Sequence, residues 1–176
     1  QGLEATRRML PYAQVYQLDD NAFAYLITGL ALYADAPQWA DQELWVGLRN
    51  ATPAQLEAAE DHASDAAERF GQRPKLMRTL ILTRLLLDRP AAALEAALQY
   101  PEDGHSGVRL VFETALAARN LDRAEAAWRD IERAGAFAAE RPLMKARLGL
   151  AAGRLDRARQ ILVSLKEAAP ADAYLN

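Results

Sequence analysis

The sequence contains no cysteine. Disulfide bonds, thiol catalysis and metal sites built on cysteine are therefore excluded. Aromatic residues make up only 7% of the chain, and the strand-favouring valine, isoleucine and threonine are sparse beside alanine and leucine. Because alanine, leucine and arginine are good helix formers, the 176 residues predict an all-α protein.

The chain also lacks an excess of basic charge. The formal net charge is -3, so the whole chain lacks the excess by which nucleic-acid-binding proteins neutralise phosphates. The composition therefore argues against nucleic acid as a partner. Lysine occurs only at Lys75, Lys145 and Lys166, and we interpret the preference for arginine as typical of a GC-rich bacterial source.

No long apolar run is present. The most apolar stretch, residues 80–87, is eight residues long and is interrupted by Thr83 and Arg84, whereas a transmembrane helix needs about 20 residues. We expect no membrane insertion by this segment, and no signal peptide is visible. Because the chain begins at Gln1 rather than at a methionine and ends on residues that read like the start of a helix, we expect it to be part of a longer protein.

Residues suited to catalysis or metal binding are few and isolated. His62 and Asp65 lie one helical turn apart, and we interpret them, with Glu57 and Glu60, as the polar face of an exposed helix rather than as metal ligands. His105 lies in a turn without the constellation of a catalytic triad. The glycines beside it lack the lysine and the preceding strand of a phosphate-binding loop. The sequence predicts no enzymatic activity, no metal and no cofactor.

The strongest pattern that is present is a repeat. The tripeptide Leu-Asp-Arg begins at Leu87, Leu121 and Leu155, so successive copies are equally spaced along the chain. A fixed period of about 34 residues, as here, is typical of stacked helix–turn–helix units. We expect the copies to mark the start of the second helix of each hairpin, with Asp88 and Asp156 as N-caps.

The repeat divides the chain into about five antiparallel helical hairpins. Residues 1–70 are expected to form N-terminal hairpins, either divergent repeats or a cap, including a helix capped by Asn21 and one that starts at a Thr52–Gln55 capping box and stops at Gly71. Three repeats and the start of a further helix are expected to follow, at residues 71–104, 105–138, 139–172 and 173–176. Further helices are predicted at residues 3–17, 37–50, 75–86, 106–118 and 141–152.

These units resemble the tetratricopeptide repeat (TPR) family, most clearly over residues 74–170. The family pattern combines small residues where helices cross, large apolar residues between them and a closing proline. The last unit matches it best, at Ala146, Gly153, Leu155, Ala158, Leu162 and Pro170. The resemblance implies a right-handed superhelix whose concave face is lined by the first helix of each hairpin.

Carrying over the family's groove positions predicts a partner-binding surface. Its residues are Lys75, Thr79, Thr83, Arg109, Glu113, Leu116, Arg147 and Leu150. The basic members are suited to an acidic or C-terminal peptide segment. The alternative interpretation is that these are ordinary solvated side chains on an exposed helix face.

The resemblance predicts a non-enzymatic scaffold that binds another protein or a peptide. Similar arrays occur in bacterial envelope and exopolysaccharide assemblies, which favours the periplasm over the cytoplasm. One alternative is a regulatory docking segment beside an enzyme domain. The other is an RNA-binding helical repeat, which is disfavoured because the residues sharing one groove position differ in charge, as Thr79, Glu113 and Arg147 do.

Overall fold

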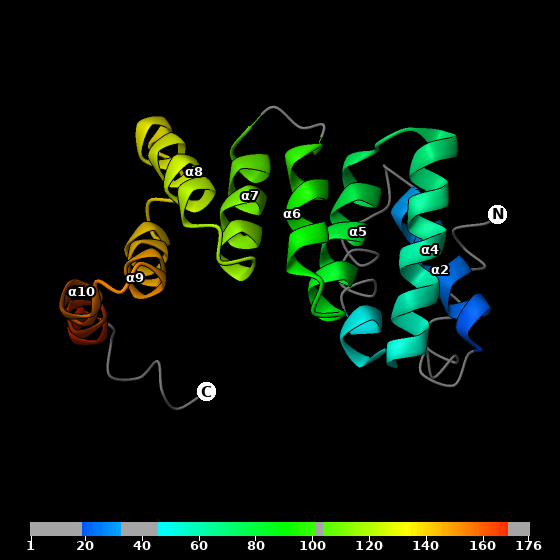
Figure 1. Cartoon of the computed structure of the whole chain (residues 1–176), viewed down its shortest axis with the longest axis horizontal. Coiled ribbons are helices and arrows are strands. Elements are labelled where there is room, and N and C mark those ends of the chain that lie inside the picture. The colour runs from blue at the N-terminus through cyan, green and yellow to red at the C-terminus, as the bar shows by residue number, and fades with distance from the viewer. Residues whose placement is uncertain (1–18, 33–45, 101–103, 169–176) are drawn as a thin grey trace. The chain divides into compact units, whose positions relative to one another are not determined.

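The computed structural model of the chain describes residues 19–32, 46–100 and 104–168 (Figure 1). Every regular element in these residues is a helix, and neighbouring helices pack against each other. The predicted all-α class is therefore confirmed for this part of the chain. The predicted helix 3–17, most of the helix 37–50, Pro170 and residues 173–176 lie outside the described residues. None of the described helices is long and apolar enough to cross a bilayer.

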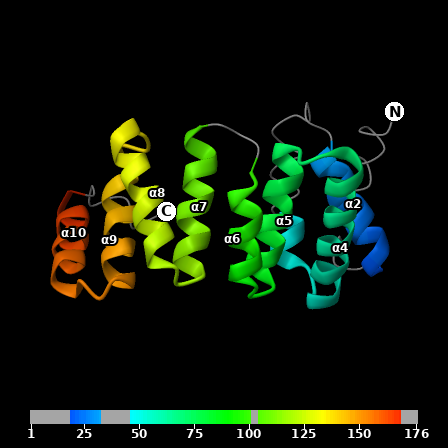
Figure 2. The ribbon, with the colours of Figure 1, turned by 45° about the horizontal axis from the view of Figure 1, so that its top comes forward.

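The chain divides into two compact units, residues 1–102 and 103–176. In the first unit, α2 packs against α4 and α5, and α5 also packs against α4 and α6 (Figure 2). The bounds are α2 Asp20–Leu32, α4 Pro53–Phe70, α5 Pro74–Leu86 and α6 Pro90–Leu98, and residues 46–50 are also helical. The core of this unit contains large apolar side chains that are at most 1% exposed, namely Phe23, Ile27, Leu48, Leu76 and Ile81.

The start and stop signals of α4 are confirmed. The backbone N–H of Gln55 donates to Thr52 Oγ1 at 3.2 Å, and the backbone N–H of Thr52 donates to Gln55 Oε1 at 3.0 Å. This capping box satisfies donors that the first turn leaves free. The helix ends at Gly71, whose φ of +80° suits glycine. For α2 the prediction was wrong, because the cap is the carboxylate of Asp19, which accepts from the N–H of Ala22 at 3.0 Å, and not Asn21.

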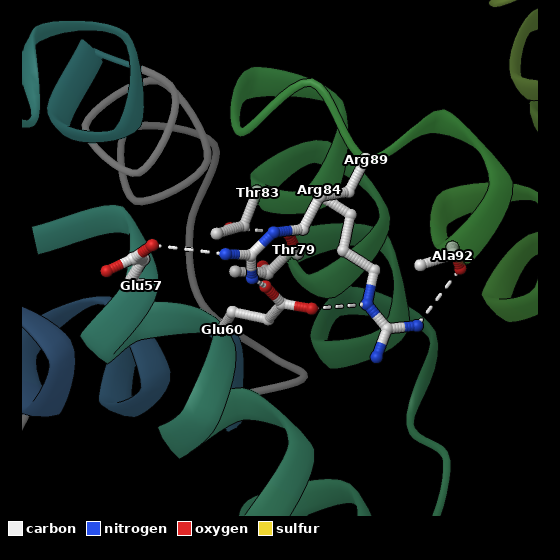
Figure 3. A network of polar contacts seen from close by, with 7 residues as sticks. All are labelled: Glu57, Glu60, Thr79, Thr83, Arg84, Arg89 and Ala92. Atoms are coloured by element: carbon white, nitrogen blue, oxygen red, sulfur yellow. Dashed lines mark hydrogen bonds and ion pairs between the residues drawn. The ribbon is translucent and has the colours of Figure 1, made fainter. Parts of the chain in front are cut away.

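A buried carboxylate connects three helices of the first unit (Figure 3). The side chain of Glu60 on α4 is 11% exposed and accepts from Arg84 Nε on α5 at 2.8 Å. Arg84 also donates from Nη1 to the carbonyl of Ala92 on α6, at 3.0 Å. Arg89 binds both Glu60 and Glu57. Glu60 is therefore part of the packing between helices, and its predicted place on an exposed acidic face was wrong.

The second unit consists of two hairpins. In these, α7 packs against α8, α8 against α9, and α9 against α10. The bounds are α7 His105–Ala117, α8 Leu121–Ala134, α9 Arg141–Ala151 and α10 Leu155–Ala168. Small residues let α9 and α10 approach closely: a Cβ built on Gly149 would lie 3.4 Å from Cβ of Ala158, which is 1% exposed.

One turn conformation joins the helices of the hairpins α5–α6, α7–α8 and α9–α10. Its central residue has a left-handed backbone, with φ of +55° at Asp88 and Arg119 and +70° at Gly153. The next residue donates its N–H to a carbonyl five residues earlier, at 2.8 Å in all three hairpins. This is the way in which helices commonly end when the chain reverses direction.

In the hairpin α5–α6, the position of the shared turn relative to the Leu-Asp-Arg tripeptide differs from that in α7–α8 and α9–α10. The separation between Asp88 and Arg119 is three residues shorter than the separation between Arg119 and Gly153. The second and third copies of Leu-Asp-Arg open α8 and α10, but the first copy forms the turn itself, and α6 begins after it at Pro90. The second helix of the first hairpin is also shorter, because α6 has 9 residues whereas α8 and α10 have 14 each.

Neither Asp88 nor Asp156 is the N-cap that the sequence predicts. Asp88 is the left-handed residue of the turn, and Asp156 lies in the first turn of α10 rather than before it. The cap of α8 is Asn120, whose Oδ1 accepts from the N–H of Arg123 at 3.1 Å. An acidic side chain inside the first turn still interacts favourably with the positive end of the helix dipole.

Candidate interaction surface

The predicted groove residues of the second unit lie on one face of α7 and of α9. When Leu143 is added to the predicted residues, because it lies one period after Arg109, each helix contributes three positions with i, i+4, i+7 spacing, which places them on a single face. Corresponding positions on the two helices are separated by the period of the Leu-Asp-Arg copies, and both sets lie at the same distance from the shared turn. This α7–α9 stripe consists of Arg109, Glu113, Leu116, Leu143, Arg147 and Leu150.

An ion pair joins the two halves of the α7–α9 stripe. Arg147 Nη1 lies 2.8 Å from Glu113 Oε1, and Arg147 Nη2 lies 2.6 Å from Glu113 Oε2. This two-pronged geometry is the strongest form of an arginine–carboxylate pair. The two residues hold equivalent positions in successive hairpins, so they neutralise each other without a partner protein.

Arg109 also has internal partners. Its Nη1 lies 2.6 Å from Glu140 Oε2, and its guanidinium carbon lies 5.2 Å from the centre of the Phe137 ring. Neither partner could be predicted from helical spacing, because both lie in the connection between α8 and α9. Arg109 and Arg147 already pair with carboxylates of this chain. The predicted binding of an acidic peptide by these two arginines would therefore gain less from charge.

Leucines are the most accessible apolar part of the stripe. Leu143 is 49% exposed and Leu150 is 47% exposed, one on each side of Arg147 along α9. Leu116 of α7 is half-buried. Exposed leucines beside ion pairs that are already satisfied can contact a partner without leaving a charge unpaired.

The predicted groove residues of the first unit do not fit this surface. Thr79 and Thr83 are 1% and 0% exposed. Their hydroxyls donate to the carbonyl oxygens of Lys75 and Thr79, each at 2.9 Å, as threonines often do inside helices. Lys75 is half-buried. The two threonines therefore belong to the interior of the unit and offer no group to a partner.

The three-residue difference in register explains the error at Lys75 and Thr79, whereas Thr83 lies two residues before its matching position. Counted back from the shared turn, the α5 positions that match the α7–α9 stripe are Arg78, Leu82 and Leu85. A three-residue offset on an α-helix rotates a position by about 60° from the intended face. That rotation replaces the half-buried Leu82 by the fully buried Thr79.

The histidines have packing contacts. The ring centre of His62 lies 4.4 Å from that of Tyr25 in an edge-on arrangement, and the ring of His105 lies 6.3 Å from that of Phe137. Among the residues described, no group of three histidine, aspartate or glutamate side chains could hold a metal ion.

No protein-family model matches the chain, and neither the curated proteins nor the solved structures contain a significant match to it.

Proposed function

We propose that the chain is a non-catalytic protein-interaction module, built of TPR-type hairpins, that binds a partner protein along the α7–α9 stripe. The observation that carries the proposal is the pair of half-exposed leucines, Leu143 and Leu150, on the same face of α9. Large apolar side chains at this exposure provide the buried contacts that dominate most protein interfaces.

The ion pairs of the stripe define the chemistry of this partner. Because Glu113 and Glu140 neutralise Arg147 and Arg109, an approaching protein gains little from added charge. It gains more from apolar side chains placed over the leucines. The proposed partner is thus a largely apolar segment of another protein, and the proposed setting is a bacterial envelope assembly.

The test is a binding comparison between wild type and the double variant Leu143→Ser/Leu150→Ser. The protein serves as bait in a lysate of the source organism, and captured proteins are identified by mass spectrometry. We expect the variant to lose a partner that the wild type retains, with an affinity loss of about 1–3 kcal/mol measured on the purified pair.

The matched control is Leu86→Ser/Leu98→Ser in the first unit, where the leucines are 42% and 49% exposed. This control removes a similar amount of exposed apolar surface elsewhere in the chain. A partner retained equally by all three proteins would place binding outside the α7–α9 stripe. A catalytic domain encoded in the full-length gene would favour the alternative of a regulatory docking segment over a passive scaffold.

A further inference from the structure

A second surface of the second unit, on the opposite face of α9, is a cleft formed by α8, α9 and α10. Its volume is about 290 Å³, near the lower end of the ~300–1,000 Å³ typical of ligand pockets. Lys145, Leu148 and Gly149 face it from α9, whereas Leu143, Arg147 and Leu150 occupy the other side of that helix. The cleft and the α7–α9 stripe are therefore separate sites.

The floor of the cleft is apolar. Trp128 of α8 is 7% exposed, Leu148 of α9 is 4% exposed, and Ala158 of α10 is 1% exposed. Gly149 and Ala158 keep α9 and α10 close together at this point. The floor belongs to the packed core, so its shape is fixed before any ligand arrives.

The walls of the cleft carry an excess of positive charge. Four cationic side chains and two carboxylates line it, which leaves a formal excess of two positive charges: Arg129, Lys145, Arg154 and Arg157 against Glu125 and Glu132. This local excess stands in a chain whose net charge is -3.

Two of the four cations are already paired. Arg154 Nη2 lies 2.9 Å from Glu125 Oε1, and Lys145 Nζ lies 3.6 Å from Glu132 Oε1 and 6.0 Å from the centre of the Trp128 ring. Arg129 and Arg157 form no hydrogen bond or ion pair with any residue in the described ranges 19–32, 46–100 and 104–168. Their guanidinium groups are the ones free to bind an anion.

We propose that this cleft binds an acidic peptide segment of a partner protein, with carboxylates on Arg129 and Arg157 and an apolar side chain on the Trp128–Leu148 floor. An arginine fork matches the geometry of a carboxylate. The cleft is also short and holds two carboxylates of its own, which disfavours a continuous phosphate backbone. An acidic peptide can direct its charges to the two arginines and avoid Glu125 and Glu132.

The test is selection of random dodecapeptides displayed on phage, with the full chain as bait. Peptides enriched in aspartate or glutamate together with a large apolar residue are the expected result. Their affinities are then measured by fluorescence anisotropy on wild type and on Arg129→Gln/Arg157→Gln. We expect a loss of about five- to tenfold for each arginine removed, and weaker binding as sodium chloride is raised.

The matched control is Arg123→Gln/Arg159→Gln. These arginines lie on the same two helices, α8 and α10, are exposed, and do not line the cleft. The control removes the same charge and should leave peptide affinity unchanged. Both double variants should melt at the wild-type temperature, because each replaces exposed side chains without partners in the described structure.

Three results would overturn the proposal. One is selection of peptides without acidic residues. Another is an equal affinity loss in the two double variants, which would reduce the effect to net charge. The third is displacement of the peptide by a single-stranded RNA oligonucleotide that binds more tightly and depends on Arg129 and Arg157. If the cleft binds no acidic peptide but a partner still binds along the α7–α9 stripe, the proposal for the cleft fails and the proposed function is unaffected.

Discussion

The left-handed residue of the shared turn is filled by three different amino acids. Gly153 adopts this conformation without a steric penalty, whereas a side chain at φ near +55°, as in Asp88 and Arg119, places Cβ close to the backbone. Short polar residues such as aspartate tolerate the conformation better than arginine does. Arg119 is therefore the least favourable of the three occupants.

Replacing Arg119 by glycine should stabilise the protein. Relief of the left-handed strain is worth about 1–2 kcal/mol, and the greater freedom of glycine in the unfolded chain removes part of it, so we expect a net gain of about 0.5–1 kcal/mol. Urea unfolding followed by circular dichroism measures this gain. Ala118→Gly, one residue earlier at φ -74°, is the control and should destabilise the protein. A loss of stability in Arg119→Gly would contradict the account of the turn.

At the scale of helices, Glu60 is the buried carboxylate of the network that connects α4, α5 and α6. Glu60→Gln keeps the shape of the side chain but removes the charge that neutralises Arg84, whose side chain is only 20% exposed. We expect the free energy of unfolding to fall by about 1–3 kcal/mol. Asp130→Asn, which breaks an exposed pair with Arg133, should change it by less than about 0.5 kcal/mol. Equal effects of the two substitutions would show that the Glu60 network contributes no more than a surface pair.

The helices themselves were predictable from the sequence because their signals are local. Capping at Thr52, the stop at Gly71, the break at Gly153 and helical spacing of apolar residues all depend on neighbouring residues. The predicted α9, residues 141–152, differs from Arg141–Ala151 by one residue. Local chemistry is thus sufficient to place these helices.

The candidate sites were harder to predict because they depend on register and on contacts between helices. Thr79 lies one period of the Leu-Asp-Arg tripeptide before Glu113. The separation between the turn residues Asp88 and Arg119 is three residues shorter than that period, so the position that matches Glu113 is Leu82. The partners of Arg109 come from a connection without helical spacing. The cleft combines residues of three helices, and sequence order alone does not show that Arg129 and Arg157 line the same cavity.

At the scale of the whole molecule, apolar packing rather than ion pairing should determine stability. Most described ion pairs have side chains that are at least a quarter exposed, as in Arg147–Glu113 and Arg154–Glu125, and such pairs contribute little and are screened by salt. Raising sodium chloride from about 0.05 M to about 1 M should therefore lower the free energy of unfolding by no more than about 1 kcal/mol. Urea unfolding at both salt concentrations tests this, and a loss of several kcal/mol would assign the ion pairs a larger role.

The three-residue difference between the two repeats has a consequence for recombining this protein. Chimaeras cut at the Leu-Asp-Arg tripeptides would join the first hairpin out of phase with the others, since Leu87 lies in a turn and Leu121 begins a helix. Crossovers placed at Asp88, Arg119 and Gly153 would instead join matching left-handed backbone conformations. The segments exchanged at these residues, each the second helix of one hairpin followed by the first helix of the next, should remain folded. The left-handed residue, and not the conspicuous tripeptide, therefore marks the boundary of the interchangeable unit.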